Sequence, residues 1–85
     1  MYKVILKKQA EKFLDEIDKN SFVRITNAIL DLSYFPPYRG DIKKLTGKYQ
    51  GMFRLRIGDI IVLFVKDDRN KTVIIYLIDN RGDIY

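Results

Sequence analysis

The sequence contains no cysteine, no histidine and no tryptophan, and it has only two prolines. Without cysteine, the chain forms no disulfide and offers no thiolate ligand to a metal. Without histidine, it lacks both the usual general base near neutral pH and the commonest metal ligand. The acidic residues are scattered rather than clustered. The sequence therefore predicts no metal site and no cofactor.

Long apolar runs are also missing. No run approaches the roughly 18 apolar residues that cross a membrane, and residues 1–12 are too polar for a cleavable signal peptide. We therefore expect a soluble, cytoplasmic protein without membrane contact. The 85 residues, 47% of them hydrophobic, are enough for one core, so we expect a single domain over residues 1–85.

The net charge of +5 lies in one part of the sequence. Residues 39–56, the basic segment, carry six basic residues and one acidic residue, an excess equal to the charge of the whole chain. A local excess of this kind indicates an anionic partner, most often a nucleic acid, although a solvated basic loop is the alternative interpretation. The basic residues of the segment are Arg39, Lys43, Lys44, Lys48, Arg54 and Arg56.

The first part of the chain predicts a strand followed by two helices. Residues 2–6 are typical of a short strand. Residues 8–34 carry two apolar stripes with the spacing of helix faces, which predicts two antiparallel helices joined near residues 18–21. We expect Asn20 or Ser21 to cap the second helix and Pro36–Pro37 to end the helical region.

The second part of the chain predicts a sheet. Apolar runs separated by short turns indicate consecutive antiparallel strands, after a connector at residues 36–48. The whole order, β-α-α-β-β-β, predicts an α+β domain in which a helical hairpin packs on one face of a twisted, mainly antiparallel four-stranded sheet. The three later strands are expected at residues 49–57, 60–66 and 72–78.

Two arginines stand inside the first of these later strands. Because strand side chains alternate between faces, Phe53 and Leu55 should face the helices while Arg54 and Arg56 face away from them. Arginine suits phosphate on such a surface, because it is always charged and donates hydrogen bonds in pairs. We therefore expect a phosphate-binding face on this strand.

Two further features of the later strands affect function. Every residue from Ile60 to Val65 is apolar, which predicts exposed apolar surface unless something covers it. The first strand, expected at or near a sheet edge, is suited to pairing with a strand from a partner.

At the end of the chain, Arg81 and Tyr85 bring a guanidinium and a phenol that suit RNA chemistry. The alternative is a surface arginine paired with a neighbouring acid and a frayed terminal tyrosine.

The stretches "KKLTGKYQGMFRLRIGD" (residues 43–59) and "NRGDIY" (residues 80–85) resemble the RelE/ParE superfamily of toxins from type II toxin–antitoxin systems, the RelE branch more than the ParE branch. The resemblance implies a RelE-like, microbial ribonuclease-type fold. It also implies a ribosome-dependent mRNA endoribonuclease that cleaves in the A site without a metal, by attack of the RNA 2′-hydroxyl. Such a toxin inhibits translation and is neutralised by a RelB-like antitoxin that folds as it binds.

The resemblance also implies roles for particular residues. Arg54 and Arg56 match the basic strand pair of the family, Arg81 its phosphate-stabilising arginine, and Tyr85 the tyrosine that stacks on or protonates the RNA. The residues that match contacts to ribosomal or messenger RNA are Arg39, Lys43, Lys44 and Lys48.

One position departs from the pattern. The family strand commonly reads "GDYRV", whereas this chain has "GDIIV", so that Ile61 stands where an arginine is usual. Losing one such donor costs about 2–4 kcal/mol of transition-state stabilisation, which implies a weakened nuclease. Two alternatives follow: a ParE-like toxin that inhibits DNA gyrase, or a relative that binds RNA or ribosomes without cleaving.

Overall fold

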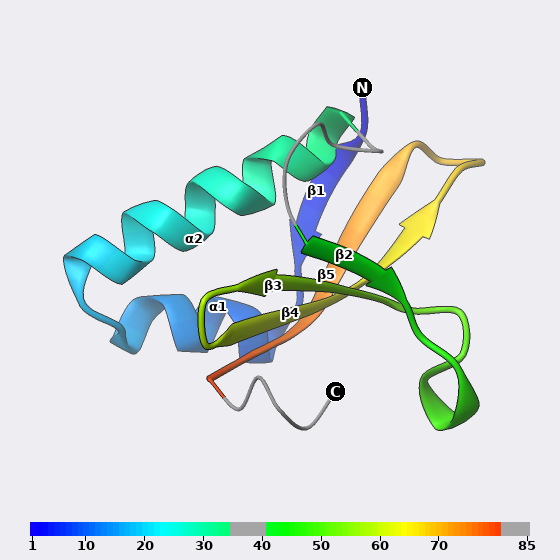
Figure 1. The fold of residues 1–85 in the computed structure, drawn as a ribbon. Coiled ribbons are helices and arrows are strands. Elements are labelled where there is room, and N and C mark those ends of the chain that lie inside the picture. The colour runs from blue at the N-terminus through cyan, green and yellow to red at the C-terminus, as the bar shows by residue number, and fades with distance from the viewer. Residues whose placement is uncertain (35–40, 81–85) are drawn as a thin grey trace.

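The computed structural model describes residues 1–34 and 41–80, and the predicted site residues Arg39, Arg81 and Tyr85 lie outside them. The described part is an α+β fold in which a helical hairpin covers one face of a sheet (Figure 1). The strands are β1 (Lys3–Leu6), β2 (Asp41–Lys44), β3 (Phe53–Ile57), β4 (Ile60–Asp67) and β5 (Thr72–Asp79). The helices are α1 (Lys8–Glu16) and α2 (Lys19–Asp31), and the short 3-10 helices are η1 (Leu32–Tyr34) and η2 (Gly47–Tyr49).

The sheet has the strand order β1-β5-β4-β3-β2. β1 pairs with β5 in parallel, and every other pair is antiparallel. The predicted fold class and the edge position of the first strand are confirmed. The predicted number of four strands was wrong, because β2 lies inside the expected connector and makes the sheet five-stranded. Its sequence "DIKK" has a single apolar residue, so it shows no alternation of apolar and polar side chains from which a strand could be predicted. The segment becomes a strand by pairing with β3.

β3 begins at Phe53, four residues later than predicted. Residues 47–49 form η2 instead, and Gly51 has a φ of +93°, a conformation that glycine adopts easily. The backbone N–H of Leu45 donates to the carbonyl oxygen of Met52 at 2.9 Å. The chain between β2 and β3 therefore folds back on itself and closes a hairpin.

The two helices pack on the sheet through the main core. α2 is capped by Asp18, whose side chain accepts a hydrogen bond from the backbone N–H of Ser21 at 3.0 Å, so the predicted cap at Asn20 or Ser21 was wrong. In residues 1–34 and 41–80, no helix is long and apolar enough to cross a membrane. The buried core residues are Ala10, Leu14, Ile25, Ile29, Leu32, Leu55, Ile60, Val62, Phe64, Val73, Ile75 and Ile78.

A bulge in β5 changes which side chains face the core. Leu63 pairs with Leu77 while the next residue, Phe64, pairs with Ile75, so that Tyr76 is the extra residue. Ile75 before the bulge and Ile78 after it both join the main core. Leu77 therefore turns toward the opposite face of the sheet.

That opposite face carries a second cluster. Leu45, Ile61 and Leu63 are buried there, with Tyr49, Met52 and Leu77 packed against them. The apolar surface expected on β4 is covered in the structure, since Ile61 is 0% and Leu63 3% exposed. The residues that follow β2 supply the cover, because Leu45, Tyr49 and Met52 all come from that segment.

Candidate nucleic-acid interface

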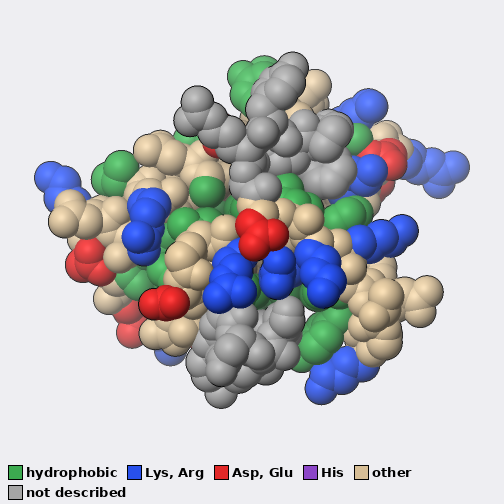
Figure 2. Space-filling view, in the orientation of Figure 1, with side chains coloured by type: hydrophobic (Ala, Val, Ile, Leu, Met, Phe, Trp, Pro, Cys, Tyr) green, Lys and Arg blue, Asp and Glu red, His purple; other side chains and the backbone are tan. Residues whose placement is uncertain are grey.

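Basic side chains gather on the face of the sheet that the helices leave open. In the antiparallel pairing of β2 with β3, Lys43 lies opposite Arg54 and Asp41 lies opposite Arg56. Directly opposite side chains share a face, so these four residues lie together, and we call this surface the arginine face. Figure 2 shows lysine and arginine side chains gathered where β2 and β3 lie in Figure 1. The predicted alternation of β3 is confirmed, because Leu55 packs in the main core on the other side.

Arg54 is held firmly in this surface. Its side chain is 11% exposed, and its Nη2 donates to Oδ1 of Asp41 at 3.1 Å. Its Nε is buried and has no hydrogen-bond partner among the described residues. On the β4 side, Arg54 lies opposite Leu63 of the second cluster. The guanidinium is therefore fixed between an apolar neighbour and one carboxylate.

Arg56 is the more accessible of the two arginines. Arg56 is exposed, and its Nε donates a hydrogen bond to the backbone oxygen of Gly58 at 3.2 Å. On the β4 side it lies opposite Ile61. The hydrogen bond to the β3–β4 turn orients the side chain while the guanidinium stays within reach of a ligand.

Of the predicted lysines, only Lys43 joins the arginines. Lys44 lies opposite Phe53, which packs against the main core, so it belongs to the other side of the sheet. Lys48 lies in η2, where its Nζ is 5.3 Å from the ring centre of Tyr49. Lys48 therefore extends the positive charge beside the second cluster, on which Tyr49 packs.

The strand register also shows where the chain leaves the sheet. Asp41, Arg56, Ile61 and Asp79 form one row across β2, β3, β4 and β5. Asp79 ends β5, so the segment that contains Arg81 and Tyr85 begins at the end of the row that holds Arg56. The roles of Arg81, Tyr85 and Arg39 stay predictions, because these residues lie outside the described part.

Asp41 is a residue of this surface for which the sequence predicted no role. This residue is the one acid of the basic segment, and it pairs with Arg54 on the arginine face. The visible signal was its spacing of two from Lys43, which places both side chains on one face of a strand. Because no strand was predicted at residues 41–44, the spacing did not predict that Asp41 and Lys43 share a face.

The shifted pKa values belong to structural contacts elsewhere. A hydrogen bond from the hydroxyl of Tyr2 lowers the pKa of Asp68 and raises the pKa of Tyr2 itself. Hydrogen bonds from Asn70 lower the pKa of Asp67. These groups hold the β4–β5 turn and the start of the chain. In residues 1–34 and 41–80, no three acidic side chains gather to hold a metal ion.

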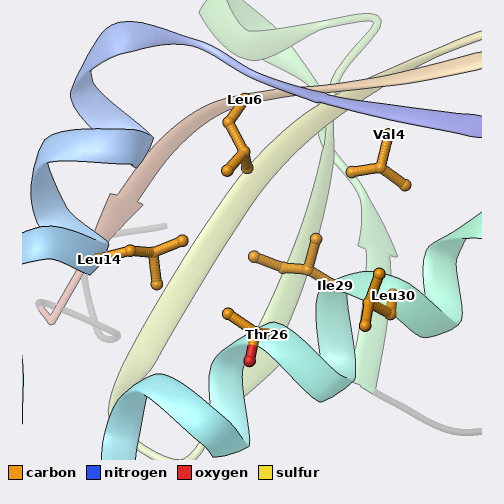
Figure 3. Close-up of a pocket in the computed structure, with 6 residues that line it drawn as sticks. All are labelled: Val4, Leu6, Leu14, Thr26, Ile29 and Leu30. Carbon is orange, nitrogen blue, oxygen red and sulfur yellow. The ribbon is translucent and has the colours of Figure 1, made fainter. Parts of the chain in front are cut away.

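A second surface feature lies on the helical side. A groove of about 220 Å³ lies between β1, α1 and α2. Figure 3 shows the residues that line it, Val4, Leu6, Leu14, Thr26, Ile29 and Leu30. A second hollow of about 260 Å³ shares three of these residues and adds Glu11, Asp15 and Phe22. Among the described residues, no strand pairs with the outer edge of β1. The groove is therefore apolar and lies beside an open strand edge.

The fold and the sequence both have relatives among toxins. Residues 4–85 match the family described as the ParE toxin of the type II toxin–antitoxin system, parDE. The chain is 30% identical to a chain of the RelE–RelB complex from Pyrococcus horikoshii, with a TM-score of 0.80 and coverage of 95% of this chain and 96% of that one. No curated protein matches the chain significantly.

Two further structures are similar. A chain of the toxin–antitoxin complex RelBE2 from Mycobacterium tuberculosis is 28% identical, with a TM-score of 0.80 and coverage of 92% of this chain and 95% of that one. A chain of the RelB–RelE complex from Methanococcus jannaschii, at 24% identity and a TM-score of 0.73, shares the fold, with coverage of 95% of this chain and 94% of that one. The family match covers nearly the whole chain, and the chain belongs to the ParE toxin family of type II toxin–antitoxin systems, within the RelE/ParE superfamily.

Proposed function

We propose that this toxin is a ribosome-dependent endoribonuclease that cleaves messenger RNA in the A site and so inhibits translation. The observation that carries the proposal is the arginine face. It presents Arg54, Arg56 and Lys43 on two paired strands, on the side of the sheet opposite the helices. A rigid strand pair with two guanidinium groups suits the phosphate backbone of RNA, which is contacted mainly through charge.

The proposed reaction needs no metal. The 2′-hydroxyl oxygen of one nucleotide attacks the adjacent phosphorus, the bond to the 5′-oxygen breaks, and a 2′,3′-cyclic phosphate forms. Arg56 stabilises the negative charge that builds on the phosphate oxygens. A guanidinium does not accept protons near neutral pH, so the 2′-hydroxyl proton passes to solvent. Arg81 adds charge stabilisation, and Tyr85 donates the proton that the leaving 5′-oxygen takes up.

The proposed regulator is a RelB-like antitoxin. Two similar structures are complexes of RelE with RelB. In this chain the groove beside β1 supports such a partner, because its lining is almost entirely apolar and its rim includes Leu30, which is 61% exposed. An amphipathic antitoxin segment would bury this surface, and its neighbouring residues would pair with the outer edge of β1.

Expression of the toxin alone tests the proposal. We expect rapid arrest of translation and new 5′ ends in messenger RNA within the ribosomal A site, mapped by primer extension. Arg56→Ala, Arg81→Ala and Tyr85→Ala should each relieve the arrest while antitoxin binding persists. Glu16→Gln, a charge change on an exposed residue of α1, serves as the control. Intact messenger RNA at full toxin expression would refute the nuclease.

A second candidate is inhibition of DNA gyrase. It is favoured by the match to the ParE family and by Ile61, which is buried where the RelE pattern usually has an arginine. Purified toxin would then block supercoiling by gyrase and induce DNA-damage responses in cells. If translation continues while supercoiling stops, this candidate replaces the first.

A further inference from the structure

Asp41 and Arg54 form an unequal pair on the arginine face. The side chain of Arg54 is 11% exposed and that of Asp41 is 61% exposed, and their ion pair measures 3.1 Å. Arg54 lies in β3, which has a strand on each side, whereas Asp41 is the first residue of an edge strand. The arginine is therefore the fixed partner, and the carboxylate can turn into solvent at little cost.

The position of the carboxylate matches the position that a ligand needs. A guanidinium binds carboxylates and phosphates through the same N–H groups. Because the side chain of Arg54 is mostly buried, a phosphate can reach it only over a small exposed area, and the Nη2 group already donates to Asp41. Two anions on one accessible group repel each other.

We propose that Asp41 is an internal competitor for phosphate at Arg54, so that RNA binding requires the carboxylate to leave the guanidinium. This inference rests on the proposed RNA-binding function. The competitor raises the phosphate density that a ligand must supply. The cost of displacing the carboxylate falls on every RNA that binds Arg54, so Asp41 lowers the affinity of the arginine face for RNA phosphate.

The same residue has a second effect while it is paired. Lys43 lies directly opposite Arg54, and Arg56 lies two residues along the strand, so Asp41 is the one carboxylate beside the three cations that β2 and β3 place on the arginine face. Directly opposite like charges destabilise a strand pair. Asp41 therefore lowers the repulsion between these cations in the free toxin, and the phosphate of the bound RNA lowers it in the complex.

The test is RNA affinity in Asp41→Asn, because asparagine keeps an oxygen for Arg54 and removes only the charge. The probe is a short fluorescent single-stranded RNA with 2′-O-methyl groups, which cannot be cleaved by 2′-hydroxyl attack. Fluorescence anisotropy should show binding about fivefold tighter than that of the unmodified toxin, as expected for loss of one ion pair. The salt slope of log K should steepen by about 0.7, the value for one more phosphate contact on a single strand.

Two comparisons separate the competitor from a structural role. Glu16→Gln removes the same charge from α1 and should leave the affinity unchanged. In an Arg54→Gln background, Asp41→Asn should bring no gain, because the competition acts through Arg54. Asp41→Ser repeats the measurement with a smaller side chain, and thermal melting verifies that each variant is folded.

Equal or weaker RNA binding in both folded Asp41 variants would overturn the proposal, as would a gain that persists without Arg54. The affinity test does not depend on cleavage. Tighter RNA binding by Asp41→Asn together with intact messenger RNA in cells would support Asp41 as a competitor and refute the proposed nuclease. Cleaved messenger RNA in cells together with unchanged RNA affinity of Asp41→Asn would support the nuclease and refute the competitor.

Discussion

Replacing Ile61 by alanine would test whether the second cluster is packed in the toxin on its own. Ile61 is 0% exposed, on the face of the sheet opposite the helices. If the cluster is a genuine core, the cost of the substitution is that of a core position. If the cluster closes only when a partner binds, the substitution would hardly change the free energy of unfolding of the isolated toxin.

The magnitude follows from the burial of the side chain. Isoleucine to alanine removes three carbon atoms, each worth about 0.8 kcal/mol when fully buried. A remaining cavity beside Leu45 and Leu63 adds to this transfer term, which brings the loss to about 3 kcal/mol. A domain of 85 residues has a total stability of about 4–13 kcal/mol at ordinary values per residue. Ile61→Ala should therefore remove a large fraction of the stability.

Urea unfolding of the purified toxin, followed by far-ultraviolet circular dichroism, measures this loss. With a slope of about 1 kcal/mol per molar urea, the midpoint should fall by about 3 M. Ile5→Ala makes the same chemical change in β1, where the residue is 40% exposed, and should cost about 1 kcal/mol. Equal losses in the two variants, or less than about 1 kcal/mol at Ile61, would refute the reasoning.

Three further predictions concern other parts of the fold. Gln9→Leu should cost about 2 kcal/mol and speed amide exchange at Ile78, because Nε2 of Gln9 donates to the Ile78 oxygen at 3.0 Å and its Oε1 accepts from the Ile78 N–H at 2.9 Å. Gly58→Ala should cost about 1 kcal/mol by urea unfolding, because Gly58 has a φ of +61°. Acid should lower the urea midpoint, because a hydrogen bond from Asn70 lowers the pKa of Asp67. The stability that the ionised Asp67 contributes is present above the ordinary pKa of 3.8 and is lost as the pH falls through the lowered pKa. Asp67→Ala should reduce that acid sensitivity.

The helical hairpin and the central strands were predictable because their patterns are long. Two apolar stripes in residues 8–34 and the alternation in β3 each repeat often enough to fix a face. β2 was not predictable, because its four residues include one apolar side chain and its strand conformation depends on the edge of β3. The bulge at Tyr76 was equally hidden, since it is defined by the register with β4 and not by the local sequence.

The candidate site was predictable in part for the same reason. Alternation placed Arg54 and Arg56 on the face away from the helices, as observed. It did not predict that the two arginines differ, because burial and pairing depend on the neighbouring strands. Asp41 pairs with Arg54 from β2, whereas Arg56 donates to the backbone at Gly58. A sequence shows which residues share a face, but the register decides which of them meet.

The place of Ile61 limits what the arginine face can do. It lies directly opposite Arg56, so an arginine at this position would set two guanidinium groups side by side, which is unfavourable in a strand pair. Isoleucine instead packs with Leu45 and Leu63, which gives the arginine face an apolar floor on β4. The positive charge of the face therefore comes from β2 and β3 alone among the described strands. Outside the strands, Lys48 of η2 adds positive charge beside the second cluster, and the sequence places two more predicted site residues, Arg81 and Tyr85, in the segment that follows β5.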